Sequence, residues 1–145
     1  MKIYCDASFD AKRGLAGLGL VICKGSKQQI ISNYIPAPDN NYAELWAIYL
    51  ASILSHGKAI IYTDSQNALQ YIQGEVKDKP RTPEQLARHR RMQVLAYKVR
   101  QFGATICKIK AHEKKFQTHL INNNLSDMAA KQGRAKFYER IKHDR

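Results

Sequence analysis

Four acidic residues stand where carboxylates could do chemistry. Asp6 falls in the middle of a predicted strand, and Asp64 directly follows a buried apolar one. Glu44 and Asp127 each fall in the first turn of a predicted helix. A carboxylate buried in a central strand, as expected for Asp6, is costly unless a cation, a partner or a proton neutralises it. If the other three acids lie nearby, a divalent cation would relieve their repulsion better than a shared proton.

Three of these acids also fit ordinary structural roles. Asn41 and Glu44 have the spacing of a helix N-cap with its capping-box acid, and Asp64 could cap the helix that begins near Ser65. Asp127 suits the positive end of a helix dipole. Taken singly, each of these acids is more often a cap or dipole residue than a site residue. Asp6 has no such alternative, because aspartate is disfavoured within strands.

The available ligand types favour a hard cation. Cys5, Cys23 and Cys107 are widely spaced within apolar runs, which indicates reduced core thiols, and the five histidines show no zinc-ligand spacing with them. Carboxylates without such a cluster suit Mg²⁺ or Mn²⁺. Two such ions about 4 Å apart would activate water and stabilise a leaving oxygen in phosphodiester hydrolysis.

The charge balance indicates a polyanionic partner. The chain has 24 Lys and Arg against 12 Asp and Glu, a formal charge of +12. Nucleic acid is the first expectation, an acidic membrane surface the second, and a merely basic protein the alternative. No segment of the sequence has the composition of a signal peptide or the length of a membrane span, so we expect a cytoplasmic protein with no membrane partner. The length predicts a single domain over residues 1–145, and we expect a monomer.

The hydrophobic pattern predicts an α/β fold that could bring the four acids together. The first three strands, joined by short turns, are expected to form an antiparallel meander, in which Gly17 and Gly19 permit close backbone approach. Later strands would join the sheet through right-handed helical crossovers. We predict strands over residues 2–9, 15–23, 29–35, 58–63 and 104–110, helices over 41–54, 65–73, 83–102 and about 123–142, and a polar loop over 111–122.

Five short motifs, placed in order along nearly the whole chain, resemble those of type 1 ribonuclease H. Any one of these motifs alone is weak evidence for the family. Five of them in the family's order, each on the expected helix or strand, are strong evidence. They are Asp6-Ala7-Ser8, Asn40-Asn41-x-x-Glu44-Leu45, Thr63-Asp64-Ser65-Gln66, Lys110-Ala111-His112 and Asn123-x-x-x-Asp127.

The resemblance implies a ribonuclease H-like fold, a five-stranded mixed sheet with strands one to three antiparallel and strands four and five added in parallel. It implies that Asp6, Glu44, Asp64 and Asp127 bind two Mg²⁺ ions, with Mn²⁺ able to substitute. The family hydrolyses the RNA strand of an RNA–DNA hybrid, leaving a 5′-phosphate and a 3′-hydroxyl. His112 matches a mobile-loop histidine that helps proton traffic or product release; without the resemblance it would be an ordinary surface histidine.

Further residues are expected to contact the nucleic acid. Ser8, Asn40, Asn41 and Gln66 match family positions that touch the hybrid, and short polar side chains suit the reading of 2′-hydroxyls. Each is also consistent with a cap or turn role. Three arginines in the helix that begins at Pro83 are expected to grip phosphates, with a solvated helix face as the alternative; they are Arg88, Arg90 and Arg91.

The sequence departs from the family pattern in four places. Ala7 replaces the usual glycine after the first aspartate, and Asp39 stands where threonine commonly lines a phosphate pocket. The loop from His112 to Asp127 is expected to be longer than usual, and the basic handle after the fourth strand to be short, because Trp46 is the only tryptophan. Two alternatives to a hybrid-specific ribonuclease stay open: a catalytically silent nucleic-acid-binding domain of this fold, and a related DNA nuclease.

Overall fold

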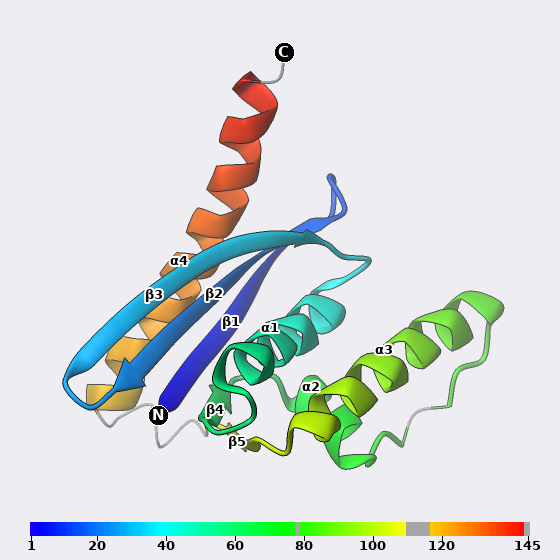
Figure 1. The fold of residues 1–145 in the computed structure, drawn as a ribbon. Coiled ribbons are helices and arrows are strands. Elements are labelled where there is room, and N and C mark those ends of the chain that lie inside the picture. The colour runs from blue at the N-terminus through cyan, green and yellow to red at the C-terminus, as the bar shows by residue number, and fades with distance from the viewer. Residues whose placement is uncertain (78, 110–116, 144–145) are drawn as a thin grey trace.

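The computed structural model of the protein describes residues 1–77, 79–109 and 117–143 (Figure 1). None of the helices within these residues is long and apolar enough to cross a membrane. The strands are β1 (Lys2–Asp10), β2 (Leu15–Lys24), β3 (Lys27–Pro36), β4 (Ile60–Thr63) and β5 (Thr105–Lys108), and the helices are α1 (Asn40–Ser55), α2 (Gln66–Gln73), α3 (Pro83–Phe102) and α4 (Gln117–His143).

The strands form one mixed sheet in the order β3-β2-β1-β4-β5. The pairs β1–β2 and β2–β3 are antiparallel, whereas β4 lies parallel to β1 and β5 parallel to β4. The short turns after β1 and β2 produce the antiparallel part, and the parallel strands follow helical crossovers. The predicted fold class and topology are therefore confirmed.

The sheet opens at the carboxyl end of β4. β4 pairs with β1 only along Lys2–Tyr4 and ends at Thr63, while β1 continues to Asp10 with β2 alone beside it. Parallel strands deliver the residues that follow them to the same edge of a sheet. Asp6 and Asp64 therefore both stand where β1 and β4 part.

Helices cover both faces of the sheet (Figure 1). On one face α1 packs against the central strands, with α2 and α3 on its outer side, and on the other α4 crosses β1, β2 and β3. β1 alternates between these layers: Ile3, Cys5 and Ala7 belong to the core beneath α1, and Tyr4 to a smaller cluster on the opposite face. This alternation is the one predicted, and it fixes which way each polar residue of β1 points.

Two glycines of β2 allow α4 to lie directly on the sheet. A Cβ atom on Gly17 would stand 1.8 Å from the Ala130 carbonyl oxygen, and one on Gly19 would stand 2.2 Å from that of Ser126. No side chain larger than hydrogen fits there, since the obstructing atoms are backbone. This contact brings the middle of α4 against the strand that neighbours Asp6.

The start of α4 corrects the sequence prediction. Residues 117–122, predicted as loop, are helical, so α4 begins six residues before the expected Asn123. Asparagine favours caps and turns, which made the run Asn122 to Asn124 read as a helix start. In the fold, buried Asn122 instead accepts a hydrogen bond from Gln28 Nε2 at 3.0 Å, and this contact with β3 holds the helix through the run. The other boundaries agree to within two residues, and those of α3 coincide with the prediction.

Candidate metal and nucleic-acid site

Asp6 and Glu44 form a buried carboxyl pair between β1 and α1. A hydrogen bond joins their side chains, and the Ala7 N–H donates to Asp6 Oδ1 at 2.9 Å. Burial raises the pKa of Asp6 to about 6. Burial, and then the charge of Asp6, raise the pKa of Glu44 to about 9. The raised pKa values of the two groups keep a proton on the pair at neutral pH, shared between the two carboxyls.

The N-caps of α1 and α2 are not the residues that the sequence predicts. The N-cap of α1 is Asp39, whose Oδ1 accepts from the Tyr42 N–H at 2.8 Å, so Asn41 and Glu44 do not form a capping pair. The N-cap of α2 is Ser65, whose Oγ accepts from the Ala68 N–H at 3.0 Å. The capping explanations for Glu44 and Asp64 are therefore wrong.

Asp64 and Asp127 complete the acidic cluster electrostatically. The charge of Asp64 adds to the raised pKa of both Asp6 and Glu44, and that of Asp127 to the raised pKa of Asp6. Asp127 lies in the third turn of α4 and not in the first, so the helix-dipole explanation fails along with the predicted boundary. Its Oδ2 forms an ion pair with Lys131 Nζ at 3.1 Å, and its side chain is 45% exposed.

A pocket of about 250 Å³ lies between the starts of α1 and α2 and contains several predicted site residues. Sequence reasoning missed Asn67, whose buried Oδ1 has no hydrogen-bond partner among the described residues. Its position three residues after Asp64, at the opening of a helix, was the available signal. The lining residues are Asn40, Asn41, Glu44, Asp64, Ser65, Gln66 and Asn67.

The cluster fits a divalent cation in its chemistry. Its oxygen donors are those that Mg²⁺ prefers, and Glu44 Oε2 is buried with no hydrogen-bond partner within the described chain. In this conformation, however, the described residues include no group of three His, Cys, Asp or Glu side chains placed to hold one ion. A proton bridges the Asp6–Glu44 pair, and Asp127 forms an ion pair with Lys131. A bound cation would have to replace both contacts.

Comparison with known proteins decides the family. The RNase H family model matches residues 1–135. The chain belongs to the RNase H family. No significant match to a curated protein sequence was found.

Solved structures of other proteins share the fold. The RNase H1 of the halophilic archaeon Halobacterium salinarum NRC-1 superposes with a TM-score of 0.68 and 18% identity, over 93% of this chain and 97% of that one. The protease-reverse transcriptase of prototype foamy virus matches with a TM-score of 0.60 and 23% identity, over 90% of this chain and 20% of that chain. At these identities the likeness concerns the fold.

Three of the remaining predicted contact residues of this RNase H domain lie in two places. Ser8 stands on β1 beyond the carboxyl pair and is bound by Arg134 of α4. Arg90 and Arg91 line a pocket of about 290 Å³ between α1 and α3, with the Arg91 guanidinium 4.8 Å from the Tyr42 ring centre.

The last two predicted site residues are Arg88 and His112. Arg88 is exposed on α3 and does not line the pocket of Arg90 and Arg91. His112 lies outside the described residues, as do its neighbours Lys110 and Ala111. The segment expected to carry a short basic handle forms no helix or strand in its described parts, 74–77 and 79–82.

Proposed function

We propose that this RNase H domain hydrolyses the RNA strand of RNA–DNA hybrids and leaves a 5′-phosphate and a 3′-hydroxyl. The observation that carries the proposal is the buried Asp6–Glu44 pair, which lies within electrostatic reach of Asp64 and Asp127 at the opening of the sheet. Repulsive acids gathered without a structural use destabilise a fold, so a role with cations is the physical reason to keep them together.

We assign Asp6, Glu44, Asp64 and Asp127 as the ligands of two Mg²⁺ ions, with Mn²⁺ as a substitute. The bound ions would supply an activated water and stabilise the leaving oxygen. The Asp6–Glu44 pair must release its proton before it can bind a cation, and because both pKa values are raised, cation binding should strengthen as pH rises. Asp127 must leave its ion pair with Lys131.

The pocket beside Glu44 and Asp64 suits the RNA strand. Its other lining residues carry amides and a hydroxyl, which can read ribose 2′-hydroxyls across the shallow minor groove of a hybrid. The net positive charge of the chain adds affinity for phosphates. Arg90 and Arg91 place part of this charge on α3. His112 follows β5 in the chain, and we propose that it assists product release, as the resemblance implies.

The proposal is tested with a hybrid labelled on either strand. With Mg²⁺ present, the RNA strand should be cut to products ending in 5′-phosphate and 3′-hydroxyl, while the DNA strand and a matched DNA duplex stay intact. No cleavage of any substrate by the metal-loaded wild type would refute the enzymatic role. Cleavage of duplex DNA would instead identify a DNA nuclease of the same fold.

A further inference from the structure

β1 and α4 carry two matching rows of side chains beyond the acidic pair. Asp6, Ser8 and Asp10 alternate along β1 and share a face. Residues seven and eleven positions after Asp127 return to one face of α4, at Arg134 and Tyr138. Gly19 and Gly17 lie opposite Asp6 and Ser8 in the β1–β2 register, and α4 packs on both glycines. Arg134 therefore meets Ser8, and Tyr138 meets Asp10.

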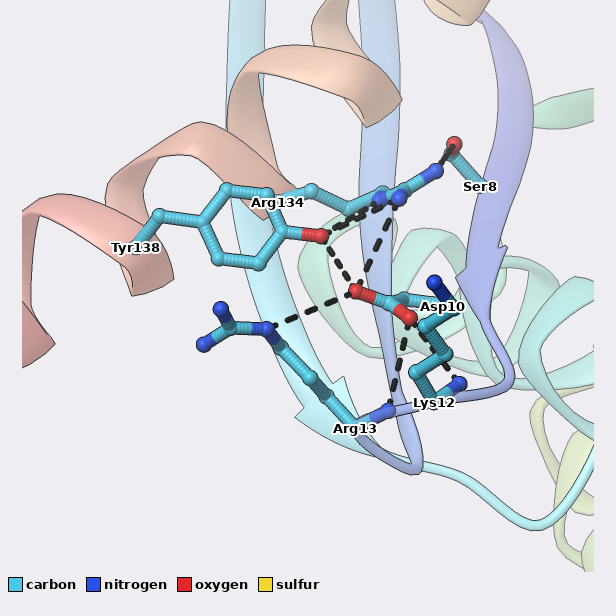
Figure 2. Close-up of polar contacts among 6 residues, drawn as sticks. All are labelled: Ser8, Asp10, Lys12, Arg13, Arg134 and Tyr138. Atoms are coloured by element: carbon cyan, nitrogen blue, oxygen red, sulfur yellow. Dashed lines mark hydrogen bonds and ion pairs between the residues drawn. The ribbon is translucent and has the colours of Figure 1, made fainter.

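Arg134 is held firmly from one side (Figure 2). Its Nε and Nη2 donate to the Tyr138 hydroxyl at 3.2 and 3.0 Å, and Nη2 lies 3.7 Å from Asp10 Oδ2. Its remaining arm, Nη1, donates to Ser8 Oγ at 3.1 Å. Because a guanidinium is planar, fixing two of its nitrogens also fixes the direction in which the third, Nη1, points. The hydrogen bond to Ser8 therefore has a defined direction.

Asp10 stays ionised and keeps this arrangement in place. The Tyr138 hydroxyl donates to Asp10 Oδ2, and the Lys12 and Arg13 backbone N–H groups donate to Oδ1 at 3.1 and 3.3 Å. These hydrogen bonds, with that of Tyr138 the strongest, and the nearby Arg134 charge lower the pKa of Asp10. Figure 2 shows this carboxylate between the two arginines and the tyrosine.

The contact with Arg134 determines what Ser8 can offer a ligand. A guanidinium only donates, so Ser8 Oγ must accept, and its own hydrogen must point elsewhere. No described residue accepts a hydrogen bond from Ser8 Oγ, and past Tyr4 no described strand covers the β4 side of β1. Ser8 stands two residues from Asp6, about 6.8 Å along the strand, which is within the reach of an adjoining nucleotide.

We propose that Arg134 is a positioning residue for RNA recognition. By occupying an acceptor site of Ser8, it directs the Ser8 hydroxyl as a donor to the 2′-oxygen of a ribose next to the scissile phosphate. The inference rests on the proposed hybrid cleavage and adds the residue that sets the polarity of the ribose contact. DNA lacks that oxygen, so the pair contributes to discrimination between the two strands.

The test is a scan of single 2′-deoxy substitutions along the RNA strand of a hybrid. For the wild type, one substituted ribose should slow cleavage at its neighbouring phosphate about three- to tenfold, the value of one hydrogen bond. Arg134→Lys keeps the charge but loses the fork. Arg134→Lys should cleave the all-RNA strand more slowly by a similar factor. It should also lose the deoxy penalty, that is, the further slowing caused by the 2′-deoxy substitution at that ribose. Ser8→Ala should behave in the same way, and the double variant should be no slower than either single variant.

A matched control and a second variant separate this role from a structural one. Arg140→Lys alters another α4 arginine that donates to a sheet residue, Tyr34, and should keep the wild-type deoxy penalty. If Arg134→Lys does not fold, Tyr138→Phe keeps the ring and removes the hydroxyl that holds Arg134, and it should weaken the penalty. Suppose that Arg134→Lys, or Tyr138→Phe in its place, cleaves every substrate more slowly by the same factor and keeps the deoxy penalty. That result would overturn the role of Arg134 and leave the proposed function standing. A wild type that cuts no hybrid would overturn the proposed function as well.

Discussion

Asp6 and Glu44 share a proton across the boundary between α1 and β1, and both groups are largely buried. The pair can lose that proton only at the cost of two adjacent buried charges. A cation removes this cost, so proton release and metal binding are linked in this domain. The first two predictions test that linkage without any substrate.

The metal-free protein should become less stable as pH rises. The folded pKa values of Asp6 and Glu44, about 6 and about 9, lie above the unfolded values of about 3.9 and 4.3. The folded state therefore holds more protons, so stability present at pH 4 is lost progressively up to about pH 9. Urea unfolding in EDTA across this range measures the slope, which Glu44→Gln should flatten. An unchanged slope in that variant would contradict the assigned proton.

Mg²⁺ should raise the melting temperature of the protein, and Lys131 should weaken Mg²⁺ binding. A ligand that binds only the folded state stabilises it by RT ln(1 + [L]/Kd), so tighter Mg²⁺ binding gives a larger rise in melting temperature at the same Mg²⁺ concentration. Lys131 competes for Asp127 through a 3.1 Å ion pair that is exposed and weak, so Lys131→Gln should lower the half-saturating Mg²⁺ concentration about threefold. Lys136→Gln is the control, because Lys136 Nζ donates a hydrogen bond to the Ser32 carbonyl oxygen on β3. Equal Mg²⁺ titrations for the two variants would exclude Asp127 as a ligand.

Gly19→Ala should destabilise the fold strongly. The new Cβ would stand 2.2 Å from the Ser126 carbonyl oxygen and 2.4 Å from the Ala130 nitrogen, and a helix backbone cannot yield locally. We expect a loss of about 3 kcal/mol, at the upper end for overpacking. Gly25→Ala meets nothing within 4 Å and should cost only the strain of its positive φ, about 1 kcal/mol. Urea unfolding of both variants provides the comparison; similar losses would argue against the close α4 contact.

Arg91 should contribute one phosphate contact. With the Asp64→Asn protein and an uncut hybrid, Arg91→Ala should reduce the slope of log affinity against log salt by about one. Lys58→Ala removes an exposed charge just before β4, at the opposite end of that strand from Asp64, and should leave the slope unchanged. If the two variants behave alike, the Arg91 side chain belongs to a solvated helix face.

The sequence was sufficient for the sheet and for the position of Asp6 and Asp64 on it. The alternation of β1 and the apolar run before Asp64 are local signals that tertiary contacts reinforce. The caps were harder to place, because Asp39, Asn41, Asp64 and Ser65 all have side chains that can cap, and only the backbone geometry selects Asp39 and Ser65.

Long-range contacts were beyond prediction from the sequence. The start of α4 depends on the contact of Asn122 with Gln28, 94 residues away. The Arg134–Ser8 hydrogen bond spans 126 residues and requires the glycine contact between β2 and α4. Neither contact leaves a pattern in its own segment, since polar residues of these types are common on helix and strand surfaces.

The most direct test of the central claim compares Asp64→Asn with Ser65→Ala. Ser65 caps α2, so Ser65→Ala should lower the unfolding free energy by about 1 kcal/mol and keep measurable RNA-strand cleavage. Asp64→Asn should fold as stably as the wild type in EDTA and show no cleavage of a labelled hybrid with Mg²⁺. An Asp64→Asn protein that still cuts the RNA strand at the wild-type rate would contradict the assignment of Asp64 to the metal site.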